Sequence, residues 1–76
     1  MTPFEQGKKA GQWTDGQIQG YGFNSAQDCL EHQEQVYQEA IDELADIYKI
    51  NPDFARQQVE YLEGIIASTR QSLRGK

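Results

Sequence analysis

Apolar side chains recur at helical spacing in the middle of the chain, between residues 24 and 50. Five follow one another at intervals of three, four or seven residues, and three more widen the stripe: Leu30, Tyr37, Ile41, Leu44 and Tyr48, with Val36, Ala40 and Ile47. Such intervals place side chains on one face of an α-helix. Neither Gly nor Pro interrupts the run, and Asn24 or Ser25 can cap its start. The pattern predicts one helix of ~25 residues, about 37 Å long.

A second amphipathic run fills residues 51–75. Asn51, Pro52 and Asp53 supply a capping side chain, a Pro at the first helical position and an acid in the first turn. Six positions then recur at alternating intervals of four and three and form a seam: Ala55, Val59, Leu62, Ile66, Thr69 and Leu73. Phe54 and Ile65 lie beside this seam. Because the connection between the two runs is short, we expect the two helices to fold back as a long antiparallel hairpin.

The first 23 residues differ in character, since they hold five of the chain's seven glycines. Thr2, Pro3 and Glu5 match a capping box at the start of a short helix. Gly7 and Gly11 lie four residues apart on one face of this helix, and would let it approach another helix closely. Residues 15–16, Asp-Gly, indicate a turn, and residues 20–22 indicate irregular chain.

Three interpretations of this glycine-rich segment stay open: a packed element, a ligand-binding loop or a disordered arm. A hairpin alone buries one face of each helix, so its flanks need a cover. The segment provides one if its apolar side chains enter the groove: Trp13, Ile18, Tyr21 and Phe23. A second hairpin, completing a four-helix bundle, is the external alternative. The sequence thus predicts an all-α fold in one small domain, residues 1–76, with a glycine-rich N-terminal element (1–23), a long acidic helix (24–50) and a second long helix (51–75).

Length and charge limit the classes of function. A chain of 76 residues has a thin core, so an active site buried on all sides is not expected. Its net charge of −5 disfavours direct binding to nucleic acid, which requires a basic face. A single cysteine, Cys29, indicates a reducing compartment. The sequence has neither a signal peptide nor an apolar run of ~20 residues, so we expect no membrane contact and a cytoplasmic location.

One constellation suggests catalysis or metal binding: Cys29 and His32 form a Cys-x-x-His pair on one predicted helix. A zinc site normally needs three or four Cys, His or acidic ligands, and a nucleophilic cysteine needs an orienting third group. The glycines form neither a phosphate-binding loop nor a dinucleotide fingerprint. The sequence therefore predicts no enzyme, no catalytic residue, no cofactor and no metal.

Acidic residues dominate the helix expected over residues 24–50. Seven lie between residues 28 and 46 without a Lys or Arg among them: Asp28, Glu31, Glu34, Glu39, Asp42, Glu43 and Asp46. Five of these acids and Gln35 follow helical spacing and form a strip roughly 27 Å long, opposite part of the apolar stripe. The helix offers the acids no (i, i+4) salt bridge, so we expect them to be unpaired.

Two interpretations of this strip compete. Acidic side chains on a solvent-exposed helix face keep a small protein soluble. Alternatively, carboxylates about 5 to 6 Å apart offer a basic groove the negative charge that a nucleic-acid backbone offers. In size and acidity the chain is similar to some phage-encoded inhibitors of host defence enzymes, a resemblance of bulk properties that covers no motif.

The second interpretation predicts a non-enzymatic inhibitor or regulator that binds another protein, one with a basic surface. The expected partner-binding residues are six acids, flanked by two aromatic residues: Asp28, Glu31, Glu39, Asp42, Glu43 and Asp46, with Tyr48 and Trp13. The alternative is a self-associating subunit, in which the apolar seams pair two hairpins as a homodimer and the acids only solubilise the assembly.

Overall fold

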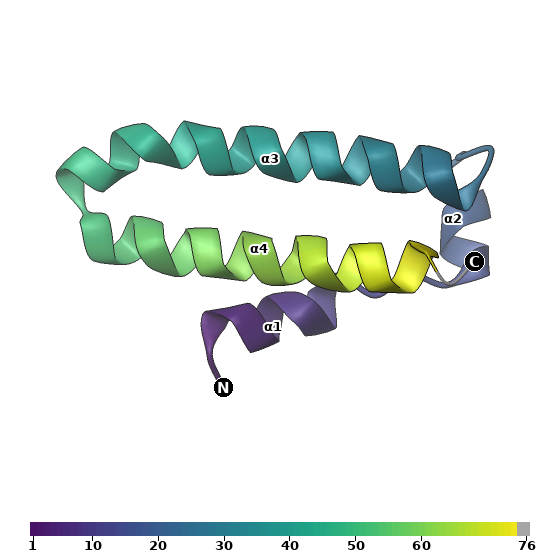
Figure 1. Ribbon diagram of the computed structural model, residues 1–76, viewed down its shortest axis with the longest axis horizontal. Coiled ribbons are helices and arrows are strands. Elements are labelled where there is room, and N and C mark those ends of the chain that lie inside the picture. Colours follow the sequence, from purple (N-terminus) through teal and green to yellow (C-terminus); the bar gives the residue numbers. More distant parts are fainter. Residues whose placement is uncertain (75–76) are drawn as a thin grey trace.

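The computed structural model describes residues 1–74, and every regular element in that range is a helix. The helices are α1 (Pro3–Ala10), α2 (Asp15–Gly20), α3 (Ala26–Ile50) and α4 (Pro52–Arg74). Figure 1 shows α3 and α4 side by side and running in opposite directions, with α1 against α4 on the side away from α3. The expected all-helical class is confirmed, and α4 is the helix that packs against both α1 and α3.

Each helix begins at a polar side chain that accepts a hydrogen bond from a backbone N–H three residues later. The Thr2 hydroxyl accepts from Glu5 at 3.2 Å, and the Ser25 hydroxyl accepts from Asp28 at 3.1 Å. The Asn51 side chain accepts from the Phe54 backbone at 3.2 Å, which ends the connection and starts α4. These bonds satisfy amide groups that have no partner inside the helix, so the local sequence determines where each helix starts.

The predicted turn at residues 15–16 is wrong, because these residues form the first turn of α2. The Thr14 backbone donates to the Gln17 side-chain oxygen at 2.8 Å, and the Gln17 backbone donates to the Thr14 hydroxyl at 3.2 Å. This reciprocal pair is a capping box. The Thr-x-x-Gln spacing was present in the sequence, and it outweighs the turn tendency of Asp-Gly.

Three glycines, which have no β-carbon, let the backbone of α1 pack directly against the backbone of α4. A β-carbon on Gly7 would overlap the carbonyl oxygen of Tyr61, and one on Gly64 would overlap the carbonyl oxygen of Phe4. Gly11 meets the α4 backbone in the same way. The prediction that Gly7 and Gly11 permit a close helix approach is therefore confirmed, and Gly64 is their counterpart on α4.

Hydrogen bonds then fasten the chain after α1 along the C-terminal half of α4. The buried Thr69 hydroxyl donates to the Gly11 carbonyl at 3.0 Å. The Ser72 hydroxyl accepts from the Trp13 backbone N–H at 2.9 Å and donates to the Trp13 carbonyl at 2.8 Å. Three side-chain bonds thus fix residues 11–13 to α4 and hold the Trp13 backbone in place.

Ala55, Ile65 and Ile66 are buried along α4, and a cluster of buried apolar side chains lies at the end of the molecule where α3 begins and α4 ends. Its buried members are Ile18, Cys29, Leu30 and Leu73, with Trp13, Phe23 and Ala26 packed against them. Most of the glycine-rich segment's apolar side chains therefore cover the core, as expected, but Tyr21 does not: it is 72% exposed. Tyr21 follows the last residue of α2, and its ring lies against the ring of Trp13 instead of entering the core.

Apolar side chains are more exposed at the other end, near the connection between α3 and α4. Tyr48 is 41% exposed, Phe54 is 47% exposed and Ile50 is 85% exposed. α1 and α2 lie away from this connection (Figure 1). The burial of α3 and α4 is thus uneven along their length.

Candidate functional site

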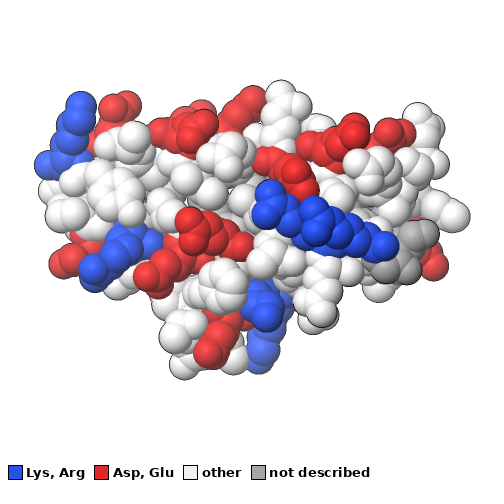
Figure 2. Space-filling model, viewed as in Figure 1, with Lys and Arg blue, Asp and Glu red and all other residues white. Residues whose placement is uncertain are grey.

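The six acids singled out in the sequence all lie on α3, and all are exposed: Asp28, Glu31, Glu39, Asp42, Glu43 and Asp46. We call them the acidic face. Figure 2 shows carboxylates recurring along the upper edge of the molecule, where α3 runs. The helical spacing places them opposite Tyr37, Ile41 and Leu44, which are half-buried. The acidic face therefore points away from the rest of the fold and is open to a partner.

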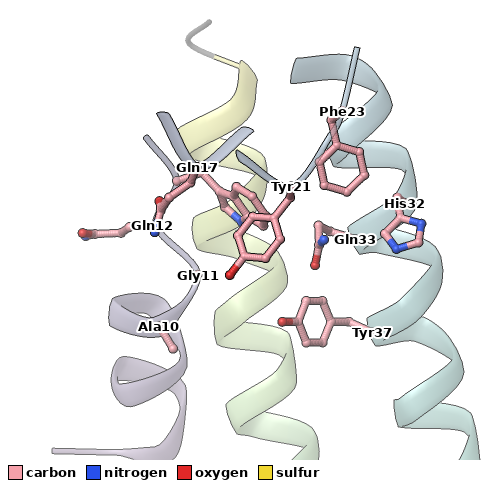
Figure 3. A pocket seen from close by; sticks show the side chains of 10 residues that line it. Ala10, Gly11, Gln12, Gln17, Tyr21, Phe23, His32, Gln33 and Tyr37 are labelled. Atoms are coloured by element: carbon pink, nitrogen blue, oxygen red, sulfur yellow. The ribbon is translucent and has the colours of Figure 1, made fainter. Parts of the chain in front are cut away.

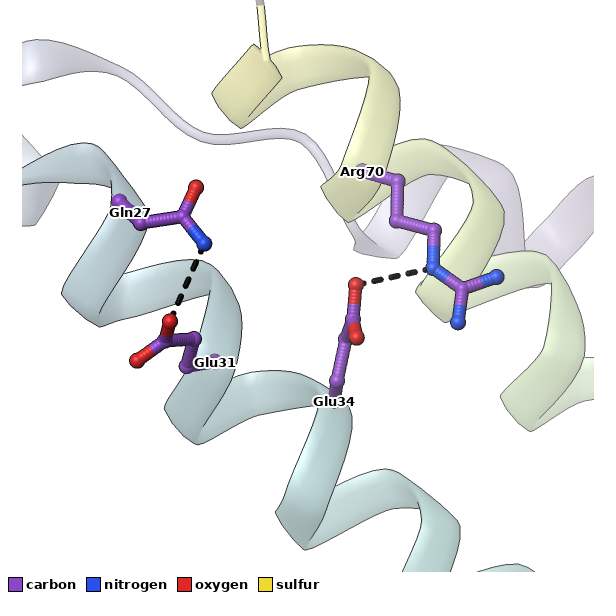
Figure 4. Close-up of polar contacts among 4 residues, drawn as sticks. All are labelled: Gln27, Glu31, Glu34 and Arg70. Atoms are coloured by element: carbon purple, nitrogen blue, oxygen red, sulfur yellow. Dashed lines mark hydrogen bonds and ion pairs between the residues drawn. The ribbon is translucent and has the colours of Figure 1, made fainter.

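Glutamines, not cations, contact part of the acidic face. Gln27 donates to Glu31 at 3.2 Å, and Gln35 donates to Glu39 at 3.3 Å; a third pair joins Gln38 to Asp42 at 3.3 Å. Each pair joins residues four apart on α3 and contributes about 0.2 to 0.5 kcal/mol to helix stability. Because glutamine is neutral, these bonds support α3 without cancelling its negative charge; Figure 4 shows the pair of Gln27 and Glu31.

The expectation that all seven acids of this helix are unpaired is wrong for Glu34. Its carboxylate lies 3.0 Å from Nε of Arg70 on α4, an ion pair that joins the two long helices (Figure 4). Glu34 sits toward α4, off the strip, which is why a cation on another helix reaches it. Within the described part of the chain, the other acids of α3 take part in no ion pair.

The two flanking aromatic residues, Trp13 and Tyr48, lie at opposite ends of α3. Trp13 is tied to Ser72 near the end of α4, beside the start of α3. Tyr48 lies three residues before Asn51, at the far connection. The structure brings the six acids together on one helix, but it does not bring these two rings together at one point.

A second feature escaped the sequence analysis: a pocket of about 500 Å³ between the chain after α1, the segment around α2, and α3. Four aromatic rings and a histidine line much of it: Trp13, Tyr21, Phe23, Tyr37 and His32 (Figure 3). We call it the aromatic pocket. Its size is in the range of small-ligand sites. The clustering of aromatic residues and glycines in residues 7–23 was the available signal, but the contribution of α3 depends on tertiary packing.

The rings of the aromatic pocket contact one another in a chain. The centroids of Trp13 and Tyr21 are 5.5 Å apart, and those of Trp13 and Phe23 are 6.2 Å apart, both edge to face. Phe23 and His32 follow at 5.4 Å. Such contacts are favourable for aromatic pairs and hold the rings in defined orientations.

Cys29 and His32 lie three residues apart on α3 but in different environments. Cys29 is fully buried in the core, where loss of contact with water raises the pKa of its thiol, so it stays protonated and unreactive near neutral pH. His32 is exposed and lies against Phe23. Among the described residues, no three His, Cys, Asp or Glu side chains are grouped so that they could hold a metal ion.

Comparisons with protein-family models, with curated proteins and with solved structures find no match. In the described part of the chain, no helix combines the length and apolar character needed to cross a membrane. The functional argument therefore starts from the acidic face and the aromatic pocket.

Proposed function

We propose that this protein is a non-enzymatic protein-binding module that docks the acidic face of α3 on a basic groove of a nucleic-acid-handling protein. The observation that carries the proposal is that six exposed carboxylates follow one helix without an ion pair to any described cation. The groove meets a row of negative charges in place of a phosphate backbone. The protein then acts as an inhibitor or regulator by occupying the groove.

The fold supports this mode of binding because contacts within the chain already hold α3 against α4. α4 packs along it, the Glu34–Arg70 pair joins the two helices, and Ser25 caps its start. A preformed face loses little conformational freedom on docking. The charge contributes mainly to the rate of encounter, which salt slows by screening.

A second candidate is self-association, favoured by the exposed apolar side chains near the connection between α3 and α4. Tyr48, Ile50 and Phe54 together offer an uncovered surface at that end. A second hairpin covering it would complete a four-helix bundle, with the acidic faces outside keeping the dimer soluble. Light scattering after size-exclusion chromatography, at low and high salt, distinguishes a monomer from this dimer.

Two triple variants of equal net charge test the principal proposal. The first neutralises part of the acidic face with Asp42→Asn, Glu43→Gln and Asp46→Asn. The control neutralises three acids elsewhere, with Glu5→Gln, Glu60→Gln and Glu63→Gln. Each protein is immobilised and challenged with a nuclease-treated lysate of the cells that express it, and retained proteins are eluted with duplex DNA.

The proposal predicts a protein that wild type and control retain, that the acidic-face variant loses, and that duplex DNA displaces. Binding of the isolated partner should then weaken steeply with salt. Equal retention by both triple variants, or a complex that duplex DNA leaves intact, contradicts docking through the acidic face.

A further inference from the structure

We propose that the aromatic pocket accepts an arginine side chain presented by the basic partner. This inference rests on the proposed function, because it names a residue type of the partner and a second contact point on this protein. Its physical basis is the combination of aromatic rings held in edge-to-face or tilted contact, neutral hydrogen-bond acceptors without a partner in the described chain, and a nearby row of carboxylates.

The rings offer the stacking surface that a guanidinium group prefers. Arginine is planar and weakly hydrated and stacks on aromatic faces, whereas the lysine ammonium is compact and strongly hydrated. The Trp13 backbone is fixed by its two bonds to Ser72, so one wall of the pocket is in place in advance. Tyr21, 72% exposed and in contact with Trp13, leaves most of its ring open to a ligand.

Two polar groups on α3 are available to accept hydrogen bonds from the ligand. Figure 3 shows Gln33 and Tyr37 projecting toward Tyr21. Both residues are half-buried, and neither side chain makes a hydrogen bond to another described residue. The Gln33 amide oxygen and the Tyr37 hydroxyl can therefore accept from the guanidinium, which has five N–H donors and no acceptor.

Charge selects a cation over an anion at this pocket. None of the ten residues that line it is Lys, Arg, Asp or Glu, so an anion finds no cationic partner among them, and the carboxylates that favour a cation lie outside the lining, on the acidic face. Asp28, the first residue of the acidic face, lies four residues before the lining residue His32 and thus on the same side of α3. The acidic face therefore adjoins the aromatic pocket at its His32 edge, although Tyr37 lines the pocket from the opposite side of α3, and a basic surface that reaches across this edge can engage both.

The test uses three small probes of matched size: the N-acetyl amides of arginine, lysine and citrulline. Citrulline keeps the shape of arginine and loses its charge. Trp13 is the only tryptophan of the chain and lines the pocket, so its fluorescence reports binding directly. Amide chemical shifts of Gln33 and Tyr37 locate the probe independently.

The arginine probe should give a saturable change in Trp13 fluorescence, and the other two probes should bind more weakly. Tyr21→Ala should weaken arginine binding by about 2- to 30-fold, the range expected for one lost cation–π contact. Tyr21 is exposed, so this variant should keep its fold, which circular dichroism checks. Tyr37→Phe, which keeps the ring and loses the acceptor, should also weaken binding. Tyr48→Ala removes a tyrosine from the far end of α3 and should leave it unchanged.

Equal binding of citrulline and arginine, or of lysine and arginine, overturns the proposal, as does the lack of a saturable signal at tens of millimolar arginine probe. Unchanged binding in Tyr21→Ala and Tyr37→Phe also overturns it. The Asp42, Glu43 and Asp46 triple variant separates this inference from the proposed function, because it alters the end of α3 remote from the pocket. It should bind the arginine probe normally even if it loses the partner.

Discussion

Replacing Gly64 by Ala perturbs the contact between α1 and α4 at one of its closest points. The new methyl group would overlap the Phe4 carbonyl oxygen, and it would come within 3.1 Å of the Lys8 backbone nitrogen. Both atoms belong to the α1 backbone, so no side-chain rotation relieves the overlap. α1 must move away from α4 as a unit.

Opposing effects determine how much Gly64→Ala changes the free energy of unfolding. Ala is about 1 kcal/mol better than Gly in a helix interior. Overpacking costs about 1 to 3 kcal/mol. Displacement of α1 also strains the three bonds that Thr69 and Ser72 make to residues 11–13, each contributing about 0.5 to 1.5 kcal/mol. We therefore expect a net loss of about 1 to 3 kcal/mol for Gly64→Ala, with a similar loss for Gly7→Ala.

Gly16→Ala is the matched control, since it makes the same substitution in α2 where space is available. The nearest atom to its new methyl group would be the Thr14 hydroxyl oxygen, at 4.0 Å. This variant should be more stable than wild type by about 0.5 to 1 kcal/mol. Thermal unfolding followed by circular dichroism measures all three, at about 4 to 8 °C per kcal/mol for a domain of this size. A Gly64→Ala protein that melts at or above wild type refutes the close-packing argument.

Three further perturbations test other parts of the fold. Thr69→Val should lower the free energy of unfolding by about 1 to 3 kcal/mol in urea titration, because it leaves the Gly11 carbonyl without its buried donor; Ser68→Ala, also buried, should cost less. Arg70→Gln should cost about 0.2 to 1 kcal/mol at low salt and less at high salt, because the Glu34 pair is partly exposed. Burial raises the pKa of the Cys29 thiol above its unfolded value, so the stability linked to it is complete below the unfolded pKa and falls as pH rises through the folded pKa. Melting temperatures from pH 7 to alkaline pH should thus decline more steeply for wild type than for Cys29→Ala.

The two long helices could be predicted because their information is local. Capping side chains at Ser25 and Asn51 mark their starts, and the apolar period runs unbroken between them. The seam positions Ala55, Ile66 and Leu73 are buried as their spacing indicates. The start of α2 was equally local, but its Thr14 and Gln17 pair competes with a turn dipeptide at the same place.

The aromatic pocket depends on information that no local pattern contains. Its lining comes from residues 10–13, from the segment 17–23 and from residues 32–37 of α3. These segments meet because Gly64 admits α1 and because Ser72 receives the Trp13 backbone. Spacing alone places Gly7 and Gly11 on one face of a helix, but it cannot say which helix they approach. Likewise, the Glu34–Arg70 pair joins residues 36 positions apart, beyond the reach of helical periodicity.

The first 23 residues of α3 contain no Lys or Arg. This absence bears on whether the acids of α3 serve solubility or the binding of a partner. Lysines placed four residues after the acids would keep the helix soluble and stabilise it by about 0.2 to 0.5 kcal/mol for each pair. Instead, the first basic residue of α3 is Lys49, and glutamines hydrogen-bond to the acids while leaving their charge intact. Solubility alone does not require this arrangement, since a mixed-charge surface provides it as well. A helix that keeps its carboxylates uncompensated at some cost in self-repulsion is what the proposed docking requires, because the partner would then supply the positive charge.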